Sequence, residues 1–191
     1  AFYVTPDRKA RFAEVYRWDR EQNKLMMNAP RTDRGSFEDP MRLESGGGGL
    51  VGSTHDYARF CQMLLGKGEI GGRRILKPET VALMTENHIG DLQVSVYGTR
   101  PQPGATTVRF GLDFAIYTDP KSVGQPYGKG SYYWGGAAGT WFWVDPVNDL
   151  AFIGMIQMQG GNRPDGLNFR ADSAKLVYAA LAGSGTTSVD Y

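Results

Sequence analysis

The stretch SYYWGGAAGTWFWVDP, residues 131–146, decides the fold class of this chain. Aromatic residues and valine on both sides of the glycines favour β-strands, and GGAAG interrupts them. Glycine inside a strand lowers its stability, so paired glycines usually mark a bulge, a bend or a place where another group approaches the backbone closely. That group is either another segment of the chain or a ligand, and the rest of the sequence has to decide between them.

Patterns on both sides of this stretch predict further strands. Apolar residues alternate with small or polar ones over residues 110–117, which is strand spacing. The segments TWFWV (140–144) and LAFIGMIQM (150–158) are apolar, and the residues DPVND between them suit a tight hairpin turn. Successive strands joined by hairpins predict an antiparallel sheet of at least three strands.

Helical signals flank the predicted strands. Ser53 with Asp56 three residues later forms a capping box before an apolar stripe, which predicts a helix over about 54–66. Pro78 suits the first turn of a second helix that reaches about Asn87. A third helical pattern ends at Gly183, with Asp165 as its N-cap. Helices on an antiparallel sheet make an α+β fold.

Length and composition indicate one domain. The chain has 191 residues, of which 41% are hydrophobic, with 21 Lys+Arg and 20 Asp+Glu. We therefore expect a single core over residues 1–191. Charges of both signs are interspersed, so no nucleic-acid partner is expected. The longest apolar runs, such as LAFIGMI at 150–156, are much shorter than the roughly 20 residues of a membrane-spanning helix, so we expect a soluble protein without a membrane span.

The domain is expected to have four consecutive parts. These are an irregular wrapping segment (1–45), a helical part (46–90), a strand part (108–158) and a C-terminal helix (165–183). The segment GGGGL at 46–50 matches neither a nucleophile elbow nor a phosphate loop and is interpreted as a structural turn.

No metal or cofactor site is predicted. Cys61 lies within a helical apolar pattern and is interpreted as a core residue. His55 and His88 show no ligand spacing with it, and each is interpreted as a capping or surface residue rather than a catalytic base.

Three segments together resemble a known family: GGGGLVGSTHDYARFCQMLLGKGEIGGRRILKPETVALMTENH, RFGLDFAIY and GSYYWGGAAGTWFWVDPVNDLAFIGMIQ. They are similar to the C-terminal half of the serine β-lactamase-related hydrolases, which include class C β-lactamases, D-alanyl-D-alanine carboxypeptidases and family VIII esterases. The resemblance covers roughly residues 44–160. It implies a partial β-lactamase/transpeptidase-like fold and a parent enzyme that acts on esters or amides through an acyl-enzyme.

The resemblance also implies a site on the quoted stretch. In the family a strand beside the active site carries Lys-Thr-Gly or His-x-Gly, which the esterase-like branch replaces with Trp-Gly-Gly; here the match is Trp134-Gly135-Gly136. These residues would bind substrate, with Tyr133 as an apolar wall. The backbone N–H of Ala137 would be the catalytic donor to the oxyanion. The competing interpretation is a bulge where a helix crosses the sheet.

The family's nucleophile motifs are absent from the sequence. It contains no Ser-x-x-Lys and no Tyr-x-Asn. We therefore expect a C-terminal portion of a longer enzyme, inactive alone, whose partner is a complementary N-terminal segment or a second copy joined at a sheet edge. The alternative is a non-catalytic binding module that keeps the groove of the fold.

The substrate class stays open among small esters, β-lactams and acyl peptides. Trp134 in place of Lys or His removes a cation that could pair with a β-lactam carboxylate, which favours esterase-like activity. Polar residues after the last strand occupy the region where relatives often recognise a substrate carboxylate, although a solvated helix start explains them equally well; they are Asn162, Arg163, Asn168 and Arg170.

Overall fold

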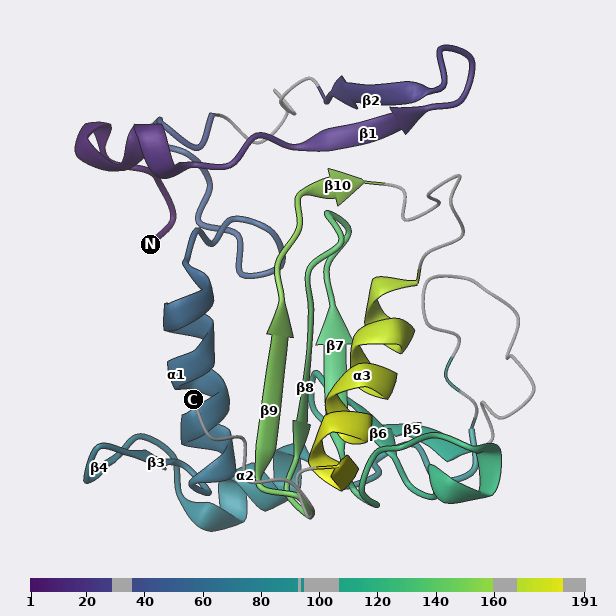
Figure 1. Ribbon diagram of the computed structural model, residues 1–191. Coiled ribbons are helices and arrows are strands. Elements are labelled where there is room, and N and C mark those ends of the chain that lie inside the picture. The colour runs from purple at the N-terminus through teal and green to yellow at the C-terminus, as the bar shows by residue number, and fades with distance from the viewer. Residues whose placement is uncertain (29–35, 93, 95–106, 160–167, 184–191) are drawn as a thin grey trace, which may run out of the picture.

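The computed structural model describes residues 1–28, 36–92, 94, 107–159 and 168–183 (Figure 1). Its centre is a five-stranded antiparallel sheet in which each strand pairs with its neighbours along the chain, in the order β5-β6-β7-β8-β9. The strands are β5 (Val108–Phe110), β6 (Ala115–Tyr117), β7 (Tyr132–Gly135), β8 (Trp141–Asp145) and β9 (Leu150–Gly154). The predicted antiparallel sheet and α+β class are confirmed.

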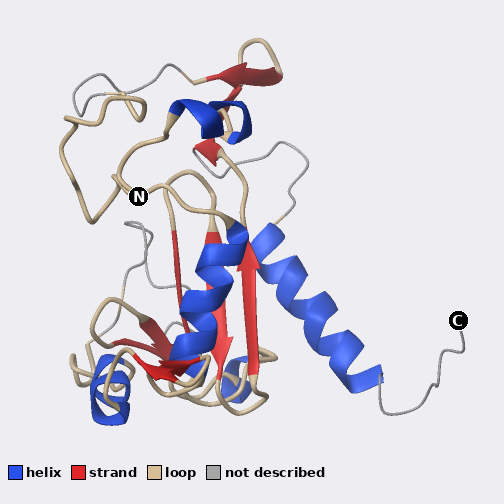
Figure 2. Cartoon of the chain, turned by 90° about the vertical axis from the view of Figure 1, so that its left-hand side faces the viewer, coloured by secondary structure: helices blue, strands red, loops and turns tan. Residues whose placement is uncertain are grey.

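Helices cover both faces of this sheet. Figure 2 shows α1 (Thr54–Leu65) and α3 (Phe169–Gly183) against different sides of the strands. Side chains of β8 alternate between the two faces: Phe142 packs in the core under α1, and Trp143 packs in the core under α3. The apolar strand TWFWV is therefore buried on both sides, which explains why it reads as a continuous run.

The helix starts follow local sequence signals. Asp56 N donates to Ser53 Oγ (3.2 Å) and Ser53 N donates to Asp56 Oδ2 (3.0 Å), so the predicted capping box is present. Helix α2 (Pro78–Met84) begins with its proline as expected but ends before Asn87. It stops there because the Met84 carbonyl accepts a hydrogen bond from Leu112 N (3.0 Å), which comes from another segment.

The prediction for the last helix needs two corrections. Helix α3 begins at Phe169 and not at 165, and the predicted cap Asp165 lies outside the described residues. Asn168 caps the helix instead: Ala171 N donates to Asn168 Oδ1 (3.1 Å), and Asn168 N donates to Asp172 Oδ2 (3.0 Å).

Two predicted strands are each divided. Residues 110–117 form the end of β5, a tight turn and β6, because Gly111 N donates to Phe114 O (2.9 Å) and Asp113 takes a left-handed φ of 67°. Residues 150–158 form β9 and then β10 (Met158–Gln159). The turn between β5 and β6 was not predicted, because in the alternating sequence pattern Gly111 and Asp113 fall at the positions that a strand would use for outward-facing residues.

The N-terminal segment is more ordered than the irregular wrapping segment expected over 1–45. It contains a 3-10 helix, η1 (Pro6–Arg11), and the hairpin of β1 (Tyr16–Asp19) and β2 (Lys24–Met27). Strand β1 pairs in parallel with β10, which gives a second sheet of order β10-β1-β2. Figure 1 shows this sheet above the ends of β7, β8 and β9.

The remaining short elements are a hairpin of β3 (Glu69–Ile70) and β4 (Arg73–Arg74) and the 3-10 turn η5 (Lys121–Val123). The segment 46–50 contains a turn in which Gly49 N donates to Ser45 O (2.7 Å). Helix α3, with 15 residues, and every other helix in the described ranges fall short of a membrane-spanning segment.

Two glycines flank Trp141 in one row across the sheet. Gly135 on β7 and Gly154 on β9 are its register partners. A Cβ on Gly154 would overlap the Trp141 indole, so the absence of a side chain lets this ring lie flat across the strand. Trp141, Gly135 and Gly154 therefore form one packing unit in the sheet.

Replacing Gly154 with alanine is expected to lower the free energy of unfolding by about 1–3 kcal/mol, because the added methyl must displace a buried indole. Urea unfolding measures the change. Gly52→Ala is the matched control, because nothing lies within 4 Å of its Cβ position and its backbone is not left-handed. Equal stability of the two variants would contradict the packing role of Gly154.

Candidate functional site

The candidate site is the turn that joins β7 to β8. Gly136 N donates to Thr140 O (2.8 Å) and Gly139 N donates to Gly136 O (3.0 Å), which closes a four-residue turn with Ala137 and Ala138 at its centre. Neither alanine has a positive φ, so the turn is of type I. Gly139 follows with a left-handed φ of 89°, a conformation that glycine adopts without strain.

The N–H of Ala137 lies at the tip of this turn. The residue is exposed, and its N–H makes no hydrogen bond to any other described part of the chain. The sequence predicted this N–H as an oxyanion donor. The structure places it where a donor to an external acceptor would have to lie, and the role itself stays a prediction.

The turn is fixed from behind by the second sheet. Ala138 O accepts a hydrogen bond from Met158 N (2.8 Å), the first residue of β10. A Cβ on Gly139 would lie 2.7 Å from Ile156 Cγ1, so the backbone of the turn packs closely on the segment that leads to β10. One neighbouring segment, residues 156–158, therefore holds the backbone of the turn that carries the candidate donor. A donor held in this way needs little reorganisation when charge develops beside it.

Trp134 and Tyr133 lie among other aromatic rings. Trp134 is half-buried and packs edge-on against Phe110, with ring centroids 5.3 Å apart. Tyr133 is buried in the core under α3 and stacks on Tyr117 at 4.8 Å. The predicted apolar wall is therefore partly core, and Trp134 is the more accessible of the two residues.

An arginine from α3 fills the space over Gly135. A Cβ on Gly135 would overlap the guanidinium of Arg170, and this guanidinium also lies 5.9 Å from the centre of the Tyr133 ring. The group that approaches this glycine is therefore a segment of the chain itself. Of the polar residues noted after the last strand, Asn168 caps α3, and Asn162 and Arg163 lie outside the described residues.

Gly136 differs from Gly135 because its side is open. It is exposed, and a Cβ there would meet only the Thr140 side chain, with Oγ1 at 2.5 Å. A rotation of Thr140 would relieve that contact. A side chain at 135 would have to displace the Arg170 guanidinium, whereas one at 136 would have to displace only the Thr140 hydroxyl.

The tyrosines beneath the site are poor proton-transfer groups at neutral pH. Burial raises the pKa of Tyr127 to about 12, and burial together with the neighbouring Tyr133 raises the pKa of Tyr117. These phenols stay protonated and neutral, and they support the site by stacking.

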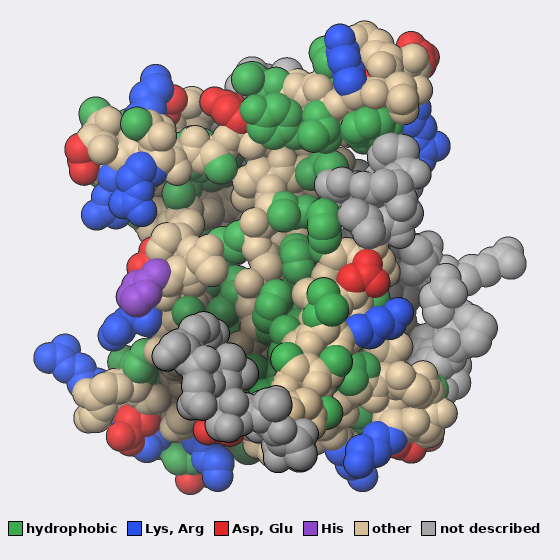
Figure 3. All heavy atoms as spheres, in the orientation of Figure 1, with side chains coloured by type: hydrophobic (Ala, Val, Ile, Leu, Met, Phe, Trp, Pro, Cys, Tyr) green, Lys and Arg blue, Asp and Glu red, His purple; other side chains and the backbone are tan. Residues whose placement is uncertain are grey.

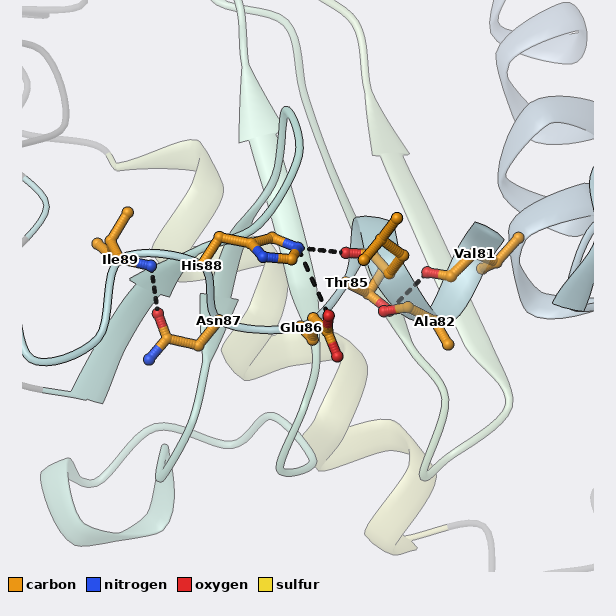
Figure 4. Close-up of polar contacts among 8 residues, drawn as sticks. Val81, Ala82, Thr85, Glu86, Asn87, His88 and Ile89 are labelled. Atoms are coloured by element: carbon orange, nitrogen blue, oxygen red, sulfur yellow. Dashed lines mark hydrogen bonds and ion pairs between the residues drawn. The ribbon is translucent and has the colours of Figure 1, made fainter. Parts of the chain in front are cut away.

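The histidines and the cysteine lie in structural positions. His55 is exposed in the first turn of α1. His88 Nε2 lies 2.6 Å from Leu83 O and 3.8 Å from Glu86 Oε1, beside the end of α2 (Figure 4). Cys61 is buried, and burial raises the pKa of its thiol to about 12. Across the described ranges, His, Cys, Asp and Glu residues form no cluster of three that could hold a metal.

Comparison with known proteins places these features in a family. Residues 1–176 match the family described as Beta-lactamase. Two Mycobacterium tuberculosis proteins, Protein Rv1367c and Uncharacterized protein MT1414, are each 38% identical over 162 residues. The matched region is 82% of this chain but 38% of each relative, so the chain spans well under half of their length.

Solved structures of other proteins share the fold of this chain. EstCE1, described as a hydrolase with promiscuous acyltransferase activity, superposes with a TM-score of 0.71 at 22% identity and covers 93% of this chain and 46% of its own. A LovD6 mutant of simvastatin synthase from Aspergillus terreus gives 0.69 at 24% identity, over 93% and 44%. At these identities the likeness establishes the fold.

Proposed function

Since this chain belongs to the beta-lactamase family, we propose that it is the part of a serine hydrolase that supplies the substrate-binding strand and one oxyanion-hole donor. Trp134 and Gly136 line the bound acyl group, and the N–H of Ala137 donates to the oxyanion. Gly135 contributes by admitting the Arg170 guanidinium beside the strand.

One observation carries the proposal: the Ala137 N–H is exposed, makes no hydrogen bond to the described chain, and lies in a turn held by residues 156–158. A fixed donor aimed at developing oxyanion charge is worth about 2.7–4 kcal/mol of activation free energy.

The same geometry refines the substrate class. Trp134 brings no charge to the position where relatives carry Lys or His, so a strongly anionic β-lactam gains little there. We propose small esters or acyl-transfer substrates. The fold neighbour EstCE1, described as a hydrolase with promiscuous acyltransferase activity, supports this choice by analogy.

The nucleophile is proposed to come from a segment outside this chain. The match covers 38% of the Mycobacterium relatives, which leaves room in proteins of that size for the Ser-x-x-Lys and Tyr-x-Asn motifs. The outer side of β9 is the proposed joining surface, because β8 is the only described strand that pairs with β9, and the sequence LAFIG has neither charge nor proline to block strand addition.

We predict that this chain alone does not hydrolyse nitrocefin or p-nitrophenyl acetate above the buffer rate, because it contains no serine activated by a lysine base. A longer protein that adds the family's nucleophile motifs should hydrolyse the ester and show an acylated serine by mass spectrometry. Turnover by the isolated chain, with a stoichiometric serine adduct, would refute the proposal that the nucleophile comes from a segment outside this chain. A longer protein without Ser-x-x-Lys would favour the non-catalytic binding module.

A further inference from the structure

One face of the β1–β2 hairpin is apolar and exposed. Tyr16 pairs with Met27, and Trp18 pairs with Leu25. Residues two apart on a strand share a face, and cross-strand partners share it too, so these four side chains form one contiguous patch, here called the apolar hairpin face. The opposite face carries Arg17, Asp19 and Lys24 together with Met26.

Three of the four side chains of this patch are exposed, and Trp18 is half-buried. The exposed fractions are 38% for Tyr16, 48% for Leu25 and 60% for Met27. Figure 3 shows hydrophobic side chains gathered over the lobe that β1 and β2 form. Contiguous apolar surface on a folded protein usually marks a place where a ligand or partner binds.

The apolar hairpin face is connected to the candidate turn through Met158. Met158 is the parallel partner of Tyr16, so Met158, Tyr16 and Met27 form one row across the second sheet. Exposure rises along this row from 8% to 38% to 60%. Met158 is also the residue whose N–H bonds Ala138 O in the turn. The row that ends in the exposed Tyr16 and Met27 is thus linked through Met158 to the turn that carries Ala137.

We propose that the apolar hairpin face binds the aliphatic chain of the ester substrate whose carbonyl meets the Ala137 N–H. This inference rests on the proposed function and adds a substrate preference to it: esters with an extended aliphatic chain are bound better than acetates. Continuity with the turn favours this occupant over a protein partner, since a partner surface would need no connection to the oxyanion donor. Each methylene removed from water brings about a fourfold gain in affinity.

The test uses methionine methyl resonances of this chain in ¹H–¹³C spectra. Methyl hexanoate should shift the Met27 and Met158 methyl signals, whereas methyl acetate at the same concentration should not. Met41, which is 87% exposed in a loop, is the internal control and should stay unchanged. We expect methyl hexanoate to bind at least about tenfold tighter than methyl acetate, and Leu25→Ser to weaken that binding several-fold while leaving the dispersion of the spectrum unchanged.

The outcomes separate this inference from the proposed function. Equal shifts at Met41 and Met27, or no shift at Met27, would overturn the inference even if the longer protein hydrolyses esters. Binding of methyl hexanoate at Met27 without any hydrolysis by the longer protein would support the site and refute the proposed function. Concentration-dependent association through the hairpin face, abolished by Leu25→Ser and unaffected by the ester, would show a protein partner there and overturn the inference.

Discussion

Replacing Asp145 with asparagine is expected to lower the free energy of unfolding by about 3 kcal/mol. The Asp145 side chain is fully buried at the end of β8. It accepts hydrogen bonds from Gly128 N (2.8 Å), Val147 N (3.0 Å), Asn148 N (3.2 Å), Asn148 Nδ2 (2.7 Å) and Tyr178 Oη (2.5 Å). Asparagine would turn an NH₂ group toward some of these donors and leave them unsatisfied in the interior.

This carboxylate joins segments that are distant in the sequence. Its partners lie in the loop before β7, in the β8–β9 turn and on α3. The residues DPVND were predicted to make a hairpin turn, and they do so with Asp145 as the acceptor for two turn N–H groups. Removal of the charge therefore weakens the attachment of α3 as well as the turn.

The loss of stability caused by Asp145→Asn should depend on pH. Burial raises the pKa of Asp145, but hydrogen bonds from Tyr178, Asn148 and Gly128 outweigh it, so the folded-state pKa lies below the ordinary value. The stabilisation is then fully present above the unfolded-state pKa of about 3.9 and is lost as the pH falls through the folded-state pKa. The stability difference between wild type and Asp145→Asn should shrink in strong acid.

Urea unfolding at several pH values measures this difference. Asp149→Asn is the matched control: Asp149 is exposed in the same turn, and its φ of 49° suits asparagine, so little change is expected. A loss below about 0.5 kcal/mol for Asp145→Asn, the size of an ordinary surface substitution, would show that the network does not stabilise the fold.

Local signals were readable from the sequence, and long-range pairings were not. The capping box of Ser53 and Asp56 depends on residues three apart, so α1 was predicted to within one residue. The pairing of Tyr16 with Met158 joins segments from opposite ends of the chain, and each strand involved is only two to four residues long. Such short strands have no periodicity to detect, and the partner decides their structure.

The candidate site was predictable only in part, because its residues form a local motif but its packing is long-range. The family resemblance led to Trp134-Gly135-Gly136 and Ala137, and the structure places this segment at an exposed turn. Sequence patterns could not predict that Arg170 fills the space over Gly135 or that Trp141 requires Gly154, because side-chain packing across strands and helices is a property of the tertiary structure. Packing therefore accounts for Gly154 and for the space over Gly135, and access for a substrate at Gly136 stays a prediction.

Ala137→Pro, made in the longer protein, is expected to slow acylation by about a hundredfold or more, the scale for loss of one oxyanion donor. Proline removes the N–H and little else at this position. Ala137 is the second residue of a type I turn, where proline is favoured, and its own N–H makes no hydrogen bond to the described chain. Pre-steady-state release of p-nitrophenol measures the acylation rate, and circular dichroism checks the fold.

Ala137→Ser is the matched control, because it changes the side chain but keeps the N–H, so its acylation rate should stay within about threefold of wild type, which corresponds to less than about 0.7 kcal/mol. Gly136→Val tests access separately. Its β-carbon displaces only Thr140 within the fold but would meet an acyl group lying on the open side of the strand. If folded Ala137→Pro acylates as fast as Ala137→Ser, this turn contributes no donor to the oxyanion and the glycines of the WGGAAG segment serve packing alone. Slow acylation in Ala137→Pro and Gly136→Val, with normal rates in Ala137→Ser, would instead require both the amide and the open backbone beside it.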